Sequence, residues 1–261
     1  MINQRVKIAN KIIQDVGKSI NQNFYSVFKI EKEIKPDKTF VTGEDKRAEK
    51  QIVTKILEHF PDDGFIGEEG ADKNSKSDFT WILDPIDGTS NFVYRIPLYT
   101  SSLALRYKQQ TVAGIIYLPS FDQLHYSIKD QGFFTENKKN SVSETKKLAE
   151  AMTLFAIPHK DQLLEKNLNL YPEILKSTKK IRLLGCVSYE MLQVAIGLCD
   201  GLVNIGSTAW DVEAAVLMIR EAGGVVCDFE GKEWTPQTGE LIATNKNLKD
   251  QYLEIVNNTL K

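Results

Sequence analysis

The apolar pattern between Leu98 and Glu136 most strongly limits the possible folds. Four short segments there are rich in β-branched and aromatic residues and are separated by turn-forming residues. They are LYTSSLALRYK (98–108), TVAGIIYL (111–118), QLHYSIK (123–129) and GFFTE (132–136). Because the links between them are too short for crossover helices, neighbouring segments should pair as antiparallel strands. The sequence therefore predicts an antiparallel meander here.

Helical periodicity precedes the predicted meander. Apolar residues recur at spacings of three and four from Ile2 to Val27, which predicts one long amphipathic helix over the first thirty residues. A second helix carries apolar residues from Ala48 to Leu57 and should end at the turn-forming stretch FPDDG (60–64). Together with the meander, these helices give the first half of the chain an α+β character.

Strands and helices alternate after the polar stretch ENKKNSVSETKK (136–147). The expected strand segments are AMTLFAI (151–157), IRLLG (181–185), DGLVNI (200–205), GGVVCDF (223–229) and GELIATN (239–245). The expected helices lie near 160–177, over 188–198, from Asp211 onward and at the end of the chain. We therefore predict an α+β domain over residues 1–140 and an α/β domain over 141–261.

Composition narrows the class of protein. Hydrophobic residues at 42% and charged residues at 26% are close to globular averages. No segment resembles a membrane span or the apolar core of a signal peptide, so we expect a cytoplasmic protein without a membrane partner. A net charge of −2 gives no sign of nucleic-acid binding. Cys186, Cys199 and Cys227 form no C-x-x-C pair, which favours reduced, buried thiols over disulfides or zinc.

The stretch WILDPIDGTSNF (81–92) ends an apolar segment in two aspartates. Asp84 and Asp87 would lie at a strand end, where an open sheet presents side chains to ligands. Pro85 would hold the two carboxylates close together, and their repulsion makes ionisation costly unless a cation is bound. The same residues also suit a proline-containing turn with aspartates bonded to backbone amides. Taken alone, this stretch is compatible with either structure.

Two further stretches add acidic residues with similar surroundings. FIGEEG (65–70) places Glu68 and Glu69 after another short apolar segment. STAWDVEAAVLMIREAGG (207–224) places Asp211 at a helix start, where Thr208 and Asp211 also fit a capping box.

Magnesium chemistry accounts for these carboxylates together. Mg²⁺ takes oxygen ligands, and a pair of ions about 4 Å apart supports in-line phosphoryl displacement. Glu68, Asp84, Asp87 and Asp211 could supply the ligands, and the amides of Gly88 and Thr89 would suit a phosphate oxygen. The residues therefore predict metal-dependent hydrolysis of a phosphate ester.

With IGEEG upstream and WDVEAAVLMIREAGG downstream, WILDPIDGTSNF resembles the inositol monophosphatase family of lithium-sensitive, magnesium-dependent phosphatases. The resemblance covers nearly the whole chain and includes FVTGEDKRAEKQI (40–52). It implies a layered α-β-α-β-α sandwich, a homodimer, and a small-molecule phosphate ester as substrate, by default inositol monophosphate. It also implies two or three Mg²⁺ ions per site.

The resemblance assigns a role to each matching residue. One ion would bind Glu68, Asp84 and the carbonyl of Ile86, a second would bind Asp84, Asp87 and Asp211, and a third would lie near Glu68. The family's nucleophile is a metal-bound water, activated with the help of a threonine and an aspartate that match Thr89 and Asp45.

Substrate contacts follow from the same resemblance. The amides of Gly88 and Thr89 would bind the phosphate, and Gly185, Cys186 and Val187 would line the substrate side. Asn204 takes the position of a glutamate that bonds substrate hydroxyls in inositol-specific members. Because Asn204 is neutral, the substrate could instead be NADP, fructose 1,6-bisphosphate or adenosine 3′,5′-bisphosphate.

Several of these residues and motifs have a second interpretation. Arg95 is either a surface residue or a contact for a second anionic group, and Lys35 and Lys38 receive no role. A haloacid-dehalogenase phosphatase would need Asp-x-Asp, whereas this chain has Asp-x-x-Asp. A non-catalytic, metal-responsive binding module is the alternative to an enzyme, and it should lack some of the ligands or the activating pair.

Overall fold

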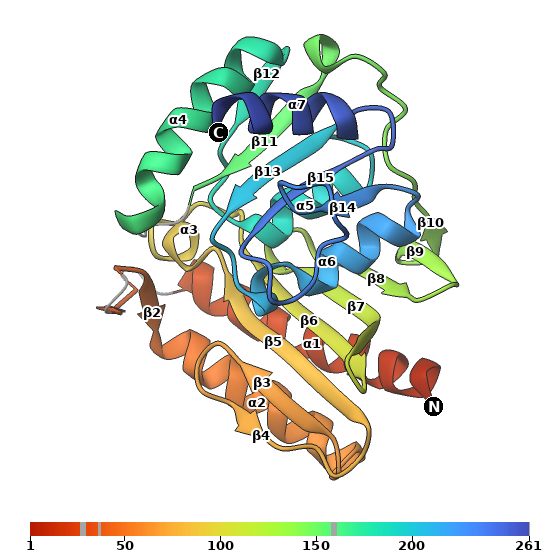
Figure 1. Ribbon diagram of the computed structural model, residues 1–261. Helices are drawn as coiled ribbons and strands as arrows, with labels where there is room; N and C mark the ends of the chain where they lie inside the picture. Colours follow the sequence, from red (N-terminus) through yellow and green to blue (C-terminus); the bar gives the residue numbers. More distant parts are fainter. Residues whose placement is uncertain (27–29, 36–37, 158–160, 261) are drawn as a thin grey trace.

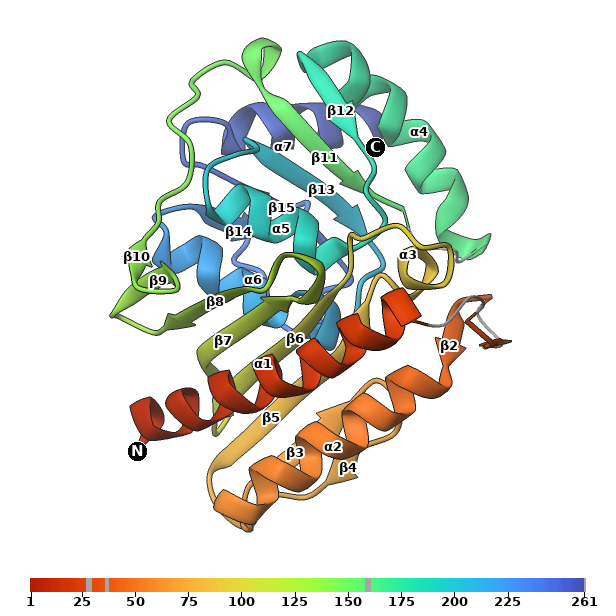
Figure 2. The ribbon, with the colours of Figure 1, turned by 180° about the vertical axis from the view of Figure 1, so that it is seen from behind.

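Helices and sheets alternate in five layers (Figure 1), as the family resemblance implies. The structure, a computed structural model, describes residues 1–26, 30–35, 38–157 and 161–260. Helices α1 (Ile2–Ser26) and α2 (Gly43–His59) cover one face of the larger sheet, as Figure 2 shows. Helices α5 (Val187–Ala195) and α6 (Ala209–Glu221) fill the layer between the two sheets. Helices α4 (Asp161–Ser177) and α7 (Lys249–Thr259) cover the outer face of the smaller sheet.

The larger sheet has eight strands in the order β10-β9-β8-β7-β6-β5-β3-β4. Their bounds are β3 (Gly64–Gly67), β4 (Asp72–Lys73), β5 (Phe79–Asp87), β6 (Thr100–Tyr107), β7 (Gln110–Leu118), β8 (Gln123–Ile128), β9 (Gly132–Thr135) and β10 (Lys138–Lys139). Strands β6 to β9 form the antiparallel meander predicted from their sequences. Strand β5 joins this meander antiparallel to β6, and it pairs in parallel with β3 on its other side.

The smaller sheet has the strand order β12-β11-β13-β15-β14. Its strands are β11 (Met152–Ala156), β12 (Lys180–Arg182), β13 (Gly201–Ile205), β14 (Val225–Cys227) and β15 (Glu240–Thr244). The first three run parallel, and β15 runs antiparallel to both β13 and β14. Strand β12 is shorter than the segment predicted for it, because the chain turns at Gly185, which has a φ of 75°.

The remaining elements are short. The hairpin β1 (Lys32–Ile34) and β2 (Phe40–Thr42) precedes α2, and helix α3 (Thr89–Val93) follows β5. Two 3₁₀ turns, η1 (Pro119–Phe121) and η2 (Leu148–Glu150), lie at Pro119 and Leu148. The first helix ends at Ser26, and Val27 lies outside the described residues. Among the described residues, no helix combines the length and the apolar character needed to cross a membrane.

The two sheets share the apolar layer that contains α5 and α6. Buried residues from both sheets pack there, including Ile82 of β5, Ile116 of β7 and Leu202 of β13. At Gly114 of β7, a Cβ atom would lie 2.5 Å from the backbone oxygen of Ala214. Helix α6 therefore approaches β7 at backbone distance, which only glycine permits.

We expect Gly114→Ala to lower the free energy of unfolding by about 1–3 kcal/mol, because the methyl group would overlap main-chain atoms of α6. Gly239→Ala is the matched control, since nothing lies within 4 Å of a Cβ at that position. Urea unfolding of both variants measures the difference. Equal stability of Gly114→Ala and the wild type would contradict the close packing of α6 on β7.

Candidate functional site

Strand β5 carries an irregularity between Asp84 and Asp87. Asp84 pairs with Ser102 of β6, whereas Asp87 pairs with Thr100, so β5 takes three steps where β6 takes two. In a regular strand, residues three apart point to opposite faces. The extra residue of this bulge turns both aspartates to the same face, toward the layer of α5 and α6. Ile86, between them, packs instead into the core beneath α1 and α2.

Asp84 is the most buried of the predicted carboxylate ligands. It is only 1% exposed, and its Oδ1 accepts the backbone N–H of Ile86 at 2.9 Å. Burial raises the pKa of Asp84 well above its ordinary value, and the charges of Glu68, Asp87 and Asp211 raise it further. The four carboxylates singled out in the sequence, from β5, α6 and the loop after β3, are therefore close enough for their charges to interact.

Asp87 contacts the beginning of α5. Its Oδ2 accepts the backbone N–H of Ser188 at 2.6 Å and the Ser188 hydroxyl at 2.5 Å. The thiol of Cys186 lies 3.2 Å from the same oxygen. Burial raises the pKa of Asp87, although the bonds from Ser188 and Cys186 oppose the rise. Ser188 was not predicted as a site residue, because nothing in the sequence indicates that α5 starts against β5.

The side chain of Cys186 does not line an open substrate surface. It is 1% exposed, and burial together with the charge of Asp87 raises the pKa of its thiol. Cys186 and Cys227 are buried and reduced as predicted, whereas Cys199 is only half-buried. Of the other two residues predicted on the substrate side, Gly185 is exposed and Val187 is half-buried.

Asp211 caps α6 with one of its carboxylate oxygens. Oδ2 accepts the backbone N–H of Thr208 at 2.6 Å and the Thr208 hydroxyl at 2.9 Å, which confirms the predicted capping box. Burial raises the pKa of Asp211 to about 7, and the charge of Asp87 contributes to the rise. Capping and proximity to the other carboxylates therefore coexist in this residue.

Asp45 and Thr89 meet, as the resemblance implies. Thr89 Oγ1 lies 3.3 Å from Asp45 Oδ1 and 3.0 Å from the carbonyl oxygen of Ile86, and it can donate to either. Asp45 belongs to the first turn of α2, where its Oδ2 accepts the backbone N–H of Thr42 at 2.8 Å. Burial raises the pKa of Asp45 to about 7.

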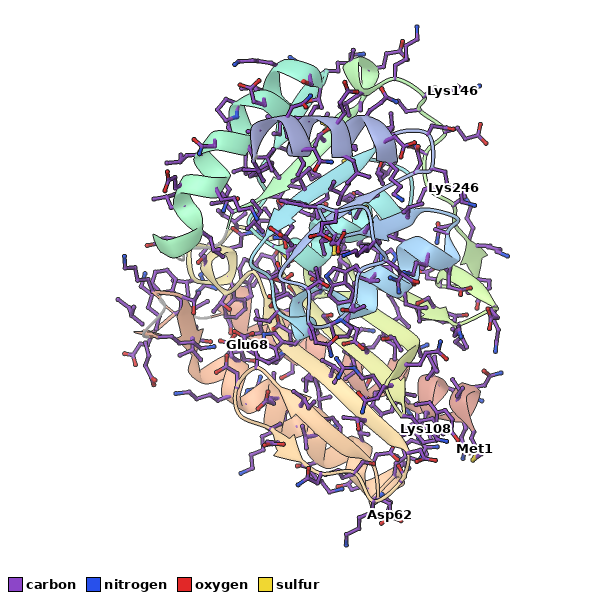
Figure 3. The ribbon with its side chains drawn as sticks, viewed as in Figure 1. Met1, Asp62, Glu68, Lys108, Lys146 and Lys246 are labelled. Atoms are coloured by element: carbon purple, nitrogen blue, oxygen red, sulfur yellow. The ribbon has the colours of Figure 1, made fainter. Side chains whose placement is uncertain are left out.

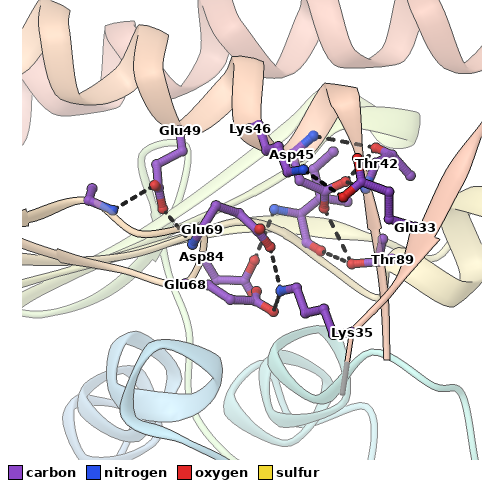
Figure 4. Close-up of polar contacts among 12 residues, drawn as sticks. Glu33, Lys35, Thr42, Asp45, Lys46, Glu49, Glu68, Glu69, Asp84 and Thr89 are labelled. Carbon is purple, nitrogen blue, oxygen red and sulfur yellow. Dashed lines mark hydrogen bonds and ion pairs between the residues drawn. The ribbon is translucent and has the colours of Figure 1, made fainter. Parts of the chain in front are cut away.

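Lys35 contacts two of the glutamates, a role that the sequence analysis left unassigned. Its Nζ lies 2.9 Å from Glu68 Oε1 and 2.6 Å from Glu69 Oε1 (Figure 4). Glu49 supports the same loop by accepting the backbone N–H groups of Glu69 at 2.9 Å and Ala71 at 2.8 Å. Figure 3 shows Glu68 near the middle of the molecule, on the side of the larger sheet that faces the smaller one. Two adjacent glutamates in the sequence indicate that a cation lies nearby, but they do not indicate which residue supplies it.

Gly88 brings β5 close to the beginning of α5. It has a φ of 83° and precedes α3, which no side chain caps. A Cβ at this position would lie 2.9 Å from Cys186 Cβ and 3.1 Å from the carbonyl oxygen of Leu98. The first backbone N–H groups of α3 have no partners within the helix, so they can meet an anion.

Asn204 and Arg95 each bury polar atoms that lack a hydrogen-bond partner among the described residues. Asn204 is 2% exposed, its Oδ1 is the unpartnered atom, and its position on β13 turns it to the same face as Leu202, toward α5 and α6. Arg95 is half-buried, with both Nη atoms enclosed and its guanidinium 5.3 Å from the ring of Phe24. Interpreting Arg95 as an exposed surface residue is therefore wrong.

The donor set fits a hard cation. Glu68, Asp84, Asp87 and Asp211 offer only oxygen atoms, and burial and mutual repulsion raise the pKa values of the three aspartates. A divalent cation would remove that cost of ionisation. Among the described residues, no three such side chains already stand in ligand positions around one point.

Known proteins of similar sequence extend over nearly the whole chain. Residues 1–261 match the inositol monophosphatase family. An inositol-1-monophosphatase of Mesorhizobium japonicum is 32% identical, with coverage of 100% of this chain and 97% of the relative. A fructose-1,6-bisphosphatase/inositol-1-monophosphatase of Aquifex aeolicus is 30% identical, covering 92% and 90%. The Nus factor SuhB of Pasteurella multocida is also 30% identical, covering 97% and 95%.

A solved structure agrees with the fold. The crystal structure of the extragenic suppressor protein suhB from Bartonella henselae superposes with a TM-score of 0.92 at 28% identity. The superposition covers 96% of this chain and 97% of that one. Sequence and architecture thus agree over the same length, and the chain belongs to the inositol monophosphatase family.

Proposed function

We propose that this protein is a magnesium-dependent phosphatase that hydrolyses a phosphate monoester of a small polyol, with inositol monophosphate as the first candidate. The observation that carries the proposal is the bulge in β5, which turns Asp84 and Asp87 to one face, near Glu68 and Asp211. The local hydrogen bonds of Asp84, Asp87 and Asp211 do not cancel their mutual repulsion, because each carboxylate makes ionisation of the others more costly and the pKa of each stays raised.

The residues that would hold Mg²⁺ follow the family pattern. Glu68, Asp84 and the carbonyl of Ile86 would hold one ion, and Asp84, Asp87 and Asp211 a second. A third would lie near Glu68, whose Oε1 is 2.9 Å from Lys35 Nζ. When bound, Mg²⁺ makes water a better nucleophile and stabilises the charge that develops on the phosphate oxygens.

Thr89 and Asp45 would handle the proton of the attacking water. Thr89 Oγ1 can accept a hydrogen bond from that water while donating its own proton to Asp45 Oδ1, 3.3 Å away. Thr42 fixes the other oxygen of Asp45, so the carboxylate keeps its orientation toward Thr89. The contact of Thr89 with the Ile86 carbonyl ties this pair to the end of β5.

The remaining residues would bind the substrate. The amides of Gly88 and Thr89 would donate to the phosphate, and the backbone of Gly185, Cys186 and Val187 would line the polyol side. The unpartnered Oδ1 of Asn204 supports a further contact, since a substrate hydroxyl could satisfy it. The homodimer and the cytoplasmic location expected from the sequence stay predictions.

Two alternatives have support in the relatives. The Aquifex aeolicus relative is named for fructose 1,6-bisphosphate as well as inositol phosphate, and a neutral Asn204 suits a broader substrate range that includes NADP and adenosine 3′,5′-bisphosphate. The Pasteurella multocida relative is named as a Nus factor, which keeps a binding role under consideration. Retention of Asp45, Glu68, Asp84, Asp87, Thr89 and Asp211 favours the enzyme.

We expect the purified protein to release phosphate from myo-inositol 1-phosphate only when Mg²⁺ is present, and millimolar lithium to inhibit that release. Fructose 1,6-bisphosphate, NADP and adenosine 3′,5′-bisphosphate complete the substrate panel, and kcat/KM ranks them. Asp84→Asn should abolish turnover while leaving the fold intact, because the amide has a similar shape but is a weak ligand. Release without Mg²⁺, or near-normal activity of Asp84→Asn, would contradict the proposal.

Removing the Thr89 hydroxyl should lower kcat by about 10² to 10⁴, because the water would lose its route to Asp45. Thr89→Val makes this change at nearly constant volume, and Thr89→Ser keeps the hydroxyl as the control. Steady-state kinetics at saturating Mg²⁺ compares the two variants. Equal kcat values for the valine and serine variants would exclude Thr89 from proton transfer.

We expect Asn204→Ala to raise KM for the preferred substrate by about tenfold with little change in kcat, since the lost contact serves the polyol and not the reacting phosphate. Asn204→Asp keeps the acceptor oxygen and should retain most of the affinity. A loss confined to kcat in Asn204→Ala, with KM unchanged, would contradict the predicted hydroxyl contact.

A further inference from the structure

Two buried side chains hold the turn that precedes α5 from opposite sides. Asn91 Nδ2 donates to the carbonyl of Leu184 at 2.7 Å, and Glu190 Oε1 accepts the backbone N–H of Leu184 at 2.5 Å. Glu190 also accepts a backbone hydrogen bond from Gly185. Both backbone groups of Leu184 are therefore bonded to side chains outside the turn.

The conformation of this turn depends on these hydrogen bonds, because its own residues do little to fix it. Gly185 has a φ of 75°, a conformation that other residues rarely adopt, and it is exposed to solvent. The next residues are those that reach Asp87, namely Cys186 through its thiol and Ser188 through its N–H and hydroxyl. A shift of the turn would therefore move every hydrogen-bond donor that these two residues direct at Asp87.

Glu190 is an unusual choice for a purely structural position. It is fully buried, and its Oε2 has no hydrogen-bond partner among the described residues. Burying a carboxyl group with one oxygen unsatisfied costs free energy, and burial raises the pKa of Glu190 to about 8. An apolar residue would fill the same space at less cost, so the carboxyl group indicates a need for the acceptor that it supplies.

We propose that Glu190 is a positioning residue, which acts through the Leu184 and Gly185 N–H groups to hold Cys186 and Ser188 against Asp87. The inference rests on the proposed function, because it assigns Asp87 to a metal ion. Glu190 bonds none of the predicted metal ligands, and it reaches the predicted substrate side only through the backbone of Gly185. Its effect should appear first in metal affinity and KM, since both depend on the placement of the turn.

The test compares Glu190→Met with Glu190→Gln in the full-length protein. Methionine fills a similar volume without an acceptor, whereas glutamine keeps the oxygen that Leu184 and Gly185 require. Isothermal titration with Mg²⁺ should give a Kd about tenfold weaker for Glu190→Met, the scale expected when support for a metal ligand is lost. Glu190→Gln should stay within about threefold of the wild type. A Glu190→Met variant that binds Mg²⁺ like the wild type would overturn the proposal.

Asp63→Asn is the matched control. Asp63 is another fully buried acid, but it bonds Arg5 and Trp81 far from the predicted ligands. Its substitution should lower the melting temperature without changing the Kd for Mg²⁺. If Glu190→Met does not fold, Glu190→Asp replaces it, since the shorter side chain draws the acceptor back from the turn. Equal affinities of Glu190→Asp and Glu190→Gln would then overturn the proposal.

Failure of this inference can be told apart from failure of the proposed function. Phosphate release by the wild type, together with unchanged Mg²⁺ binding and KM in Glu190→Met, would refute the positioning role alone. Mg²⁺ binding that weakens in Glu190→Met, without phosphate release from any substrate, would refute the function and support the positioning role. A wild type that binds no Mg²⁺ would overturn both.

Discussion

The extra residue in β5 is the constraint on which the site depends. Without it, Asp84 and Asp87 would point to opposite faces of the larger sheet, and one of them would lie in the apolar core beneath α1 and α2. Pro85 suits the position, because a bulged residue need not donate to the ladder. The Ser101 hydroxyl donates a hydrogen bond to the Pro85 carbonyl oxygen at 2.7 Å. The bulge is therefore a satisfied local structure, although it interrupts the strand pairing.

Asp84 and Asp87 face the middle layer, and the N-terminal ends of the helices in that layer stabilise the negative charge there. The backbone N–H of Ser188 in the first turn of α5 donates to Asp87, and Asp211 lies in the first turn of α6. The positive end of each helix dipole thus lies near a carboxylate and partly offsets the cost of burying it. The ammonium group of Lys35 further offsets the cost of the acidic cluster through its ion pair with Glu68. The site is assembled from both halves of the chain, around charges that no single element could bury alone.

Most of the structural features that the sequence predicts are determined by residues close to one another in the chain. The meander, the long first helix and the Thr208–Asp211 cap depend on neighbouring residues, so the sequence predicts them. The predicted acidic ligands came from residue spacing and the family resemblance, and the Thr89–Asp45 pair came from the resemblance alone. Contacts between distant segments could not be predicted, because no periodicity records them. Lys35 on the two glutamates, Ser188 and the Cys186 thiol on Asp87, and Glu190 under the turn are of this kind.

The contact between Gly114 and α6 has a consequence for how this site can vary. Main-chain atoms of β7 and α6 meet directly there, so no side chain sets the distance between them. Asp211 lies in the first turn of that helix, and Asp84 lies on a strand of the same sheet as β7. The distance between Asp84 and Asp211 is thus set by a contact between backbone atoms and not by the size of a side chain. Apolar residues elsewhere in the layer could therefore change in size without changing the spacing of the predicted ligands.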